Sequence, residues 1–197
     1  MSEPKLISPI LDNFAIGGPI SDHHGVRCYP AMENDFNDRY IVKIISVPAS
    51  QTNLDALLLT GAYSSLESAL SYFKDMADDV IREVAILDKL SRLEGFLPYR
   101  ASQCAQKDDG NGYDVYLLSP YRRSLSRQFT KNPLTQLDAL NLGLDMCAAL
   151  SVCRRSGYLY VSLKPNNIYV SSEKGYYIGD LGFIPLDALK YTSIPER

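Results

Sequence analysis

The sequence predicts an α+β fold in which a strand-rich first part is followed by a long helix and then by further strands and helices. Two observations carry this prediction. Short runs of apolar and β-branched residues, separated by turn residues, fill most of the first 45 positions. Beyond Pro48 the apolar residues recur every three or four positions, which is the period of a helix that buries one face.

The strands are expected where such runs lie between glycines or Asn/Asp-rich turns. Three of them lie in the first part of the chain, and a fourth follows the acidic, glycine-containing turn near residue 110. A hairpin is expected further on, across a polar turn. The expected strands are residues 14–16, 26–29, 40–45 and 113–118, and the hairpin pairs 167–170 with 176–178.

Three helices are expected from the spacing of leucine and other apolar residues. A short one lies around residues 54–58, and a long one covers 66–90 before Gly95 and Pro98 end it. The third runs from Thr135, the cap residue of a predicted capping box, to Gly157. Its apolar residues, which are expected to be buried, are Leu137, Leu140, Leu144, Ala148 and Val152.

Composition and charge exclude several classes of protein. Hydrophobic residues make up 46% of the chain and charged residues 22%, a balance that excludes wholesale disorder. The net charge of −3 provides no positive field, so no nucleic-acid partner is expected. Apolar clusters fall far short of the ~18 residues that span a bilayer, so no membrane contact is expected within this segment. Four cysteines without a CxxC pair indicate reduced thiols and a cytoplasmic location.

Three residues that could carry chemistry stand in separate, strand-associated stretches. Lys43 lies in an otherwise apolar strand, and Asn167 and Asp180 lie at the two ends of the expected hairpin. Alone, each is equally typical of a structural role, such as a lysine at a sheet edge or an aspartate in a turn. Together, the amide and the carboxylate could bind a hard cation through oxygen. The lysine, oriented by Glu83 of the long helix, could hold phosphate oxygens.

In order and spacing these residues resemble the eukaryotic-type protein kinase family, which contains a strand lysine in VAIK, a helix glutamate, HRDLxxxN and DFG. Tyr40-Ile-Val-Lys43 resembles the strand motif, and Glu83 the helix glutamate. Tyr160-Val-Ser-Leu-Lys-Pro-Asn-Asn167 is similar to the catalytic loop, in its serine/threonine form, and Asp180-Leu-Gly182 to the metal-binding turn. The resemblance covers nearly the whole chain and implies a bilobal fold.

The resemblance also implies that the chain binds ATP with Mg²⁺. Asn167 and Asp180 would hold the metal, and Lys164 would neutralise charge on the transferred phosphoryl group. In the hinge Ser119 would be the small gatekeeper residue, with the carbonyl of Pro120 and the N–H of Arg122 facing adenine. The implied nucleotide-binding positions are Gly17, Gly18, Gly25, Ile41, Lys43, Glu83, Ser119, Pro120, Arg122 and Tyr169.

The departures from the family pattern bear most on activity. Ser162 stands where an aspartate would accept the substrate's hydroxyl proton, and a serine hydroxyl has no ionised form available near neutrality. Val161 replaces the arginine that would pair with a phosphorylated activation loop. Near the glycines, Pro19 lacks an N–H for phosphate and Asp22 adds negative charge. Ile41 adds volume where adenine would lie, unless the sheet repacks around it.

The resemblance divides the chain into an N-lobe, residues 1–121, and a partial C-lobe, residues 122–197. An inserted helical stretch around 52–75 lengthens the connection between the lysine and the helix glutamate. Residues 194–196 could be a compressed APE, but we favour an activation segment cut short, with most of the helical C-lobe missing. The leucines of the third helix would then form an exposed apolar patch.

These observations predict a kinase-like domain that binds Mg-ATP, with weak or absent phosphoryl transfer and a protein substrate or regulatory protein as partner. One alternative is an interaction module that binds no nucleotide, which Pro19 and Ile41 favour. Another is an active serine/threonine kinase with an atypical catalytic loop.

Overall fold

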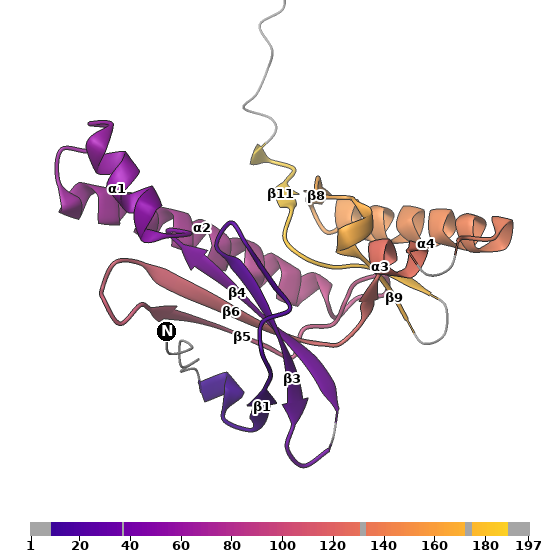
Figure 1. Ribbon diagram of the computed structural model, residues 1–197. Coiled ribbons are helices and arrows are strands. Elements are labelled where there is room, and N and C mark those ends of the chain that lie inside the picture. Colours follow the sequence, from indigo (N-terminus) through magenta and orange to yellow (C-terminus); the bar gives the residue numbers. More distant parts are fainter. Residues whose placement is uncertain (1–8, 37, 131–132, 172–174, 189–197) are drawn as a thin grey trace, which may run out of the picture. The chain divides into compact units, whose positions relative to one another are not determined.

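A computed structural model describes residues 9–36, 38–130, 133–171 and 175–188 (Figure 1). Its contacts group the chain into two compact units. Unit 1 consists of Met1–Arg82 and Tyr99–Tyr121, and unit 2 of Glu83–Pro98 and Arg122–Arg197. Strands and helices occur in both, which confirms the α+β class. The division into kinase-like lobes, 1–121 and 122–197, stays a prediction, and the possible APE at 194–196 lies outside the described residues.

Unit 1 is built on one antiparallel sheet, of which Figure 1 labels β1, β3, β4, β5 and β6. The strands run in the order β1-β3-β4-β6-β5, and β2 pairs with the opposite end of β3 from β1. The strands are β1 (Phe14–Ile16), β2 (Ser21–His23), β3 (Val26–Glu33), β4 (Arg39–Val47), β5 (Ala101–Gln106) and β6 (Tyr113–Pro120).

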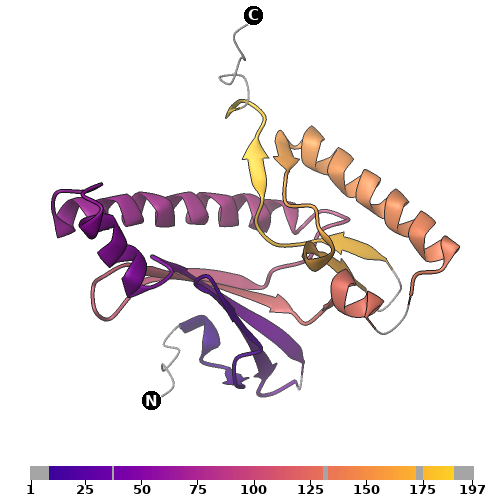
Figure 2. The ribbon, with the colours of Figure 1, turned by 45° about the horizontal axis from the view of Figure 1, so that its top comes forward.

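The central strand β4 separates two hydrophobic clusters, because successive side chains of a strand point to opposite faces. On one face Val42 and Ile44 are fully buried in a cluster that includes Leu11 of the short helix η1 (Pro9–Leu11). On the other, Ile45 packs with residues of α1 (Gln51–Leu59) and α2 (Leu66–Leu90). Figure 2 shows α2 along one side of the sheet and η1 on the other. Lys43 therefore shares the α2 face of β4.

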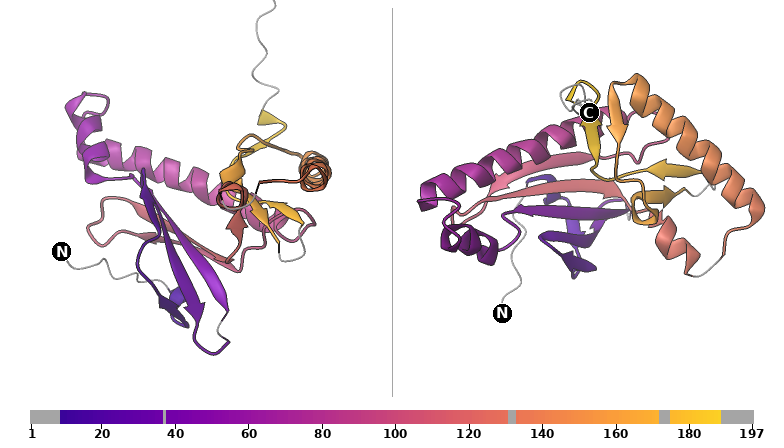
Figure 3. Two further views of the ribbon diagram at one scale, coloured as in Figure 1. Left: turned by 45° about the vertical axis from the view of Figure 1, so that its right-hand side comes forward. Right: turned by 90° about the horizontal axis from the view of Figure 1, so that it is seen from above.

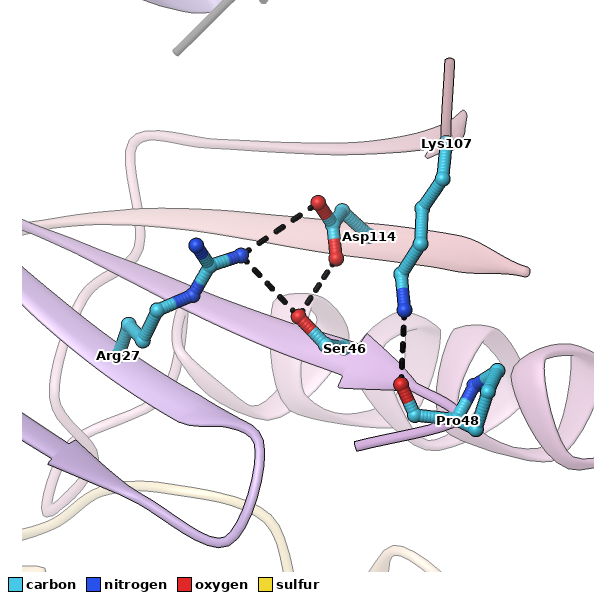
Figure 4. Close-up of polar contacts among 5 residues, drawn as sticks. All are labelled: Arg27, Ser46, Pro48, Lys107 and Asp114. Carbon is cyan, nitrogen blue, oxygen red and sulfur yellow. Dashed lines mark hydrogen bonds and ion pairs between the residues drawn. The ribbon is translucent and has the colours of Figure 1, made fainter. Parts of the chain in front are cut away.

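A polar network ties three strands together at the end of the sheet near the β2–β3 turn (Figure 4). Ser46 donates a hydrogen bond to Asp114, 2.6 Å, and accepts one from Arg27, 3.2 Å. Arg27 also lies 3.6 Å from the Asp114 carboxylate. Beside the network, Lys107 donates to the carbonyl oxygen of Pro48, 2.7 Å, and burial lowers the pKa of its ammonium group. All five residues belong to unit 1, so the network stabilises this sheet.

A second polar cluster lies at the other end of the same sheet. The Arg100 guanidinium donates to both carboxylate oxygens of Glu33, each at 2.6 Å, and to the hydroxyl of Tyr40 at 2.7 Å. It also lies 5.3 Å from the centroid of the Phe14 ring. The hydrogen bond from Arg100 holds the pKa of the Glu33 carboxyl below its ordinary value.

This cluster makes the stability of the protein depend on pH in the acid range. A carboxyl whose pKa is lower in the folded than in the unfolded state stabilises the fold above the unfolded pKa, and this contribution disappears as the pH falls through the folded pKa. We expect Glu33→Gln to lower the free energy of unfolding more at pH 7 than at pH 4. Urea unfolding of both proteins at the two pH values measures this. Glu67→Gln, an exposed change in α2, is the control. Equal losses at both pH values would contradict the prediction.

The described residues of unit 2 include two small sheets and the long helix α4. The sheets have the orders β10-β9-β7 and β11-β8, and α4 packs along β10 and β8 (Figure 3). The elements are β7 (Arg123–Ser124), α3 (Leu125–Phe129), α4 (Gln136–Arg155), β8 (Tyr158–Tyr160), η2 (Pro165–Asn167), β9 (Ile168–Val170), β10 (Tyr176–Ile178) and β11 (Phe183–Pro185).

Helix α4 begins with the predicted capping box, which is formed by Thr135 and Asp138. The prediction of its buried face is wrong. The buried residues of α4 are Met146, Ala149 and Cys153, spaced three and four apart. Gly95 packs closely against this face, since a Cβ there would lie 2.8 Å from the Cβ of Ala149. Leu137, Leu140 and Leu144 are 65%, 60% and 60% exposed, which agrees with the exposed apolar patch that was also expected. Ala148 is exposed and Val152 is half-buried.

Candidate functional site

The β9–β10 hairpin brings Asn167 and Asp180 to the same end of one element. Ile168 is paired with Ile178, and the N–H of Gly179 donates to the carbonyl oxygen of Asn167, 3.0 Å. Asn167 is buried, with 6% of its surface exposed, and its Nδ2 donates to the carbonyl oxygen of Ser162, 3.1 Å. The Oδ1 of this amide is an oxygen of the kind that ligates hard cations.

The turn at residues 179–183 has an unusual backbone. Asp180 has φ +76° and Gly182 has φ +135°, both in the region that favours glycine. Within the turn the N–H of Leu181 donates to Oδ1 of Asp180, 2.9 Å. Aspartate is one of the few non-glycine residues that adopt the left-handed region, and contacts from the surrounding chain help to hold it there.

Tyr160 supplies one such contact. Its hydroxyl donates to the carbonyl oxygen of Gly179, 2.8 Å, inside the protein, and its ring lies 4.9 Å from that of Phe183. Burial raises the pKa of the Tyr160 hydroxyl, which therefore stays protonated and remains a donor near neutrality.

Glu83 supplies a second contact from helix α2. Its Oε1 accepts hydrogen bonds from the backbone N–H groups of Gly182 and Phe183, the latter at 2.7 Å. Both partners of these bonds belong to unit 2. The carboxylate therefore joins the helix to the turn that contains Asp180.

Ser162 lies directly against the same turn. A Cβ on Gly182 would come within 2.3 Å of the Ser162 hydroxyl oxygen, and the neighbouring N–H of Val161 donates to the carbonyl oxygen of Gly182, 2.8 Å. Lys164 is exposed, and its carbonyl oxygen accepts from the N–H of Asn167, 2.9 Å.

Unit 2 thus brings together four of the predicted site residues, Glu83, Ser162, Asn167 and Asp180. Tyr169, also predicted, lies next to Gly179, where a Cβ would approach its ring to 2.6 Å.

The other predicted nucleotide-binding residues lie in unit 1, apart from Arg122, which is exposed in unit 2. Lys43 is paired with Cys28 and Leu117. Two positions along β4, Ile41 is paired with Ser119, which is 9% exposed, and Pro120 ends β6. Lys43 and Ile41 therefore share one face of the sheet. Their convergence with the residues of unit 2 stays a prediction.

The predicted phosphate-binding glycines do not form one turn. Gly17 and Gly18 lie in the interruption between β1 and β2, where the N–H of Gly17 donates to the carbonyl oxygen of Pro30, 2.9 Å. Gly25 lies in the two-residue turn between β2 and β3, after His24. Both turn residues have positive φ, 51° and 79°. Of the three glycines, Gly25 alone lies at the tip of the hairpin.

The donors at the hairpin end fit magnesium. Asn167 and Asp180 offer amide and carboxylate oxygen, and Mg²⁺ is usually held by one or two such ligands together with water and substrate phosphates. Within the described part of the chain, no group of three or more His, Cys, Asp and Glu residues is placed to bind a metal by itself. Any metal here would therefore need ligands from a bound phosphate or from water.

Comparison of the chain with protein-family models and with curated proteins finds no match in either case. Among the described residues, no helix is long and apolar enough to cross a membrane. From its place in the sequence Glu83 is expected to orient a lysine, and Tyr160 has no expected role. Both residues contact the turn at residues 179–183. In the sequence, Gly179 and Gly182 are the signal that indicates this turn.

Proposed function

We propose that this chain is a serine/threonine-protein-kinase-like domain that binds Mg-ATP and transfers phosphoryl groups weakly or not at all. The observation that carries the proposal is the assembly around one turn of unit 2. There a helix carboxylate, Glu83, a buried amide, Asn167, and an acid, Asp180, meet beside Ser162. These four residues were singled out by their order and spacing alone. A cytoplasmic location and a protein substrate or regulatory partner belong to the same proposal.

In this proposal each residue has a defined task. Lys43 holds phosphate oxygens as a point charge. Asn167 and Asp180 hold Mg²⁺, which would neutralise charge on the phosphates when bound. Ser162 leaves the acceptor hydroxyl of the substrate without a base, which costs ~10²–10⁴-fold in rate. Kinase turnover of ~1–100 s⁻¹ would then fall to roughly 10⁻⁴–1 s⁻¹.

In this proposal the residues around adenine make the affinity for ATP lower than in a typical kinase. Ile41 and Ser119 are direct cross-strand neighbours, so the extra methylenes of Ile41 lie beside the small gatekeeper residue. Added volume in a fitted pocket costs ~1–3 kcal/mol, which is about 5- to 150-fold in affinity.

Binding of Mg-ATP is the test of this proposal. A ligand that binds only the folded state stabilises it by ~2.7 kcal/mol at 100 times Kd, and each kcal/mol raises Tm by about 2–4 °C. We expect ATP with Mg²⁺ to raise Tm, and Asp180→Asn and Lys43→Met to remove the rise. Lys74→Met, an exposed lysine of α2 in unit 1, is the matched control and keeps it. Absence of any rise in the unsubstituted protein at saturating nucleotide would refute the proposal.

A second candidate function, an interaction module without nucleotide, is favoured by one observation. Leu137, Leu140 and Leu144 form an exposed apolar stripe on α4, with the three- and four-residue spacing of a helix face. This candidate predicts no effect of Mg-ATP on Tm. The same experiment therefore separates the two candidates.

A further inference from the structure

Strand β5 forms one edge of the sheet of unit 1 (Figure 1). It pairs with β6 over six consecutive residue pairs, from Ala101 opposite Leu118 to Gln106 opposite Tyr113, without a bulge. On its other side β5 pairs with none of the described strands. Within the described part of the chain, this edge of the sheet is therefore open.

The register decides which backbone groups of β5 lie at the open edge. In an antiparallel ladder, residue pairs that exchange hydrogen bonds alternate with pairs that do not. The N–H of Lys107 donates to the carbonyl oxygen of Gly112, 2.9 Å, in the same register as the strand pairs. The odd-numbered residues of β5 therefore bond to β6, and the N–H and C=O groups of Ser102, Cys104 and Gln106 point away from it. The same three residues are exposed.

The two edges of the sheet differ in how they would meet another strand. Exposed edges are usually protected by charged residues, prolines, bulges or very short strands. The opposite edge has such protection, because β1 and β2 have three residues each, Pro19 lies between them and β2 contains Asp22. The six residues of β5 include neither a charged residue nor a proline. Of the two edges, that of β5 is therefore the one compatible with a further strand.

The sequence of β5 suits pairing with a second copy of itself. Two antiparallel copies related by a two-fold axis at Cys104 place the two Cys104 residues opposite each other, and Ser102 opposite Gln106 twice. With the axis one residue to either side, one outward residue of each copy would face a residue outside β5. No like charges meet in this register, which would be destabilising. Just beyond the strand Arg100 lies opposite Asp108, so no like charges meet there either.

We propose that this protein forms a symmetric homodimer in which the open edges of β5 pair in antiparallel fashion and join the two sheets. A second copy is the favoured partner because the strand's own sequence completes the ladder with all three outward residues, in a closed two-fold arrangement. The strand has six residues, far fewer than the ~20–30 residues a side of a stable interface. The dimer is therefore weak and reversible, and it does not depend on nucleotide binding.

The two Cys104 thiols face each other in this dimer but stay reduced. Directly opposite residues that exchange hydrogen bonds have Cα atoms about 5.5 Å apart, a distance that a disulfide can span. Burial, followed by the charges of Asp78 and Asp114, raises the pKa of the Cys104 thiol. The thiol is therefore protonated near neutrality and slow to oxidise. The dimer is held by backbone hydrogen bonds, so we expect it to persist in the presence of a reducing agent.

Two double variants of the full chain test the proposed register. Ser102→Lys with Gln106→Glu places opposite charges across the interface twice, whereas Ser102→Lys with Gln106→Lys places like charges there twice. Sedimentation equilibrium of the unsubstituted protein, with reducing agent, should show the mass rising with concentration from 22.0 kDa toward twice that value. We expect the Lys/Glu variant to keep the dimer and the Lys/Lys variant to have a Kd at least about tenfold higher.

Equal Kd values for the two double variants would overturn the proposal, and association through the exposed leucines of α4 would give this result. A monomer at every concentration would overturn it as well. Amide hydrogen exchange of the unsubstituted protein by NMR gives a test without substitutions. The amides of Ser102, Cys104 and Gln106 should exchange several-fold more slowly at high than at low protein concentration, while that of Ala105, already bonded to β6, should not change. Exchange independent of concentration at all four amides would refute strand pairing.

Discussion

Ser162→Asp is expected to raise the rate of phosphoryl transfer from ATP about 10²- to 10⁴-fold. The expected gain is that of a general base, because a carboxylate at position 162 can accept the proton that a serine hydroxyl cannot. The position is favourable for this role. Ser162 is half-buried beside the turn that contains Asp180, and its carbonyl oxygen is fixed by Asn167. Labelled-phosphate transfer to serine- and threonine-containing peptides, and to the chain itself, measures the rate.

Ser162→Asn is the matched control, since asparagine has the size of aspartate and no ionisable group. We expect its rate to stay near that of the unsubstituted protein. Equal rates for the aspartate and asparagine variants would show that position 162 does not govern transfer. If the unsubstituted protein is already fast, the alternative of an active kinase with an atypical catalytic loop gains support.

The sequence predicted those elements that a regular period or a local cap defines. Helix α2 lies at the predicted residues 66–90, since its buried face repeats without interruption. The strand predicted at 14–16 and the strands of the 167–178 hairpin were likewise found, with the hairpin's first strand beginning one residue later. In these cases residues near in sequence decide the structure, so a single sequence is enough.

The sequence did not predict features that depend on distant residues. Strand β5 has the sequence Ala-Ser-Gln-Cys-Ala-Gln, in which alternating small and polar residues give little strand signal, and its pairing with β6 makes it a strand. The prediction of the buried face of α4 was wrong. It was based on the leucines, because they are the most apolar residues of the helix. The buried face instead consists of Met146, Ala149 and Cys153, and Ala149 lies against Gly95, a residue distant in the sequence.

The candidate site shows the same division. Asn167 and Asp180 could be paired from the sequence, because a short hairpin joins them and places them at one end. The hydrogen bonds between Glu83 and the turn could not be predicted from the sequence, since they join positions about a hundred residues apart. The resemblance implied Gly17, Gly18 and Gly25 as nucleotide-binding positions, and this role stays a prediction. Gly25 lies at a hairpin tip, where it follows His24 and both residues have positive φ.

Gly182→Ala is expected to be the most destabilising substitution at the site. At φ +135° an L side chain is strained by ~1–3 kcal/mol. The new Cβ would also lie 2.4 Å from the Cβ of Ser162 and 3.2 Å from its backbone nitrogen, so overpacking adds ~1–3 kcal/mol. A total of ~2–6 kcal/mol is a large share of the ~5–15 kcal/mol that stabilises a typical protein. Urea unfolding measures the loss, and Mg-ATP binding is expected to disappear with it.

Gly143→Ala is the control, because Gly143 lies in α4, is exposed and has no atom within 4 Å of its missing Cβ. Alanine there should stabilise the protein by ~0.5–1 kcal/mol, since glycine weakens a helix interior. Combining Gly182→Ala with Ser162→Gly then tests the cause. Removing the Ser162 side chain relieves the overpacking but not the backbone strain, so about half of the lost free energy of unfolding should return. No recovery at all would show that the cost lies in the backbone alone and that Ser162 does not pack against the turn.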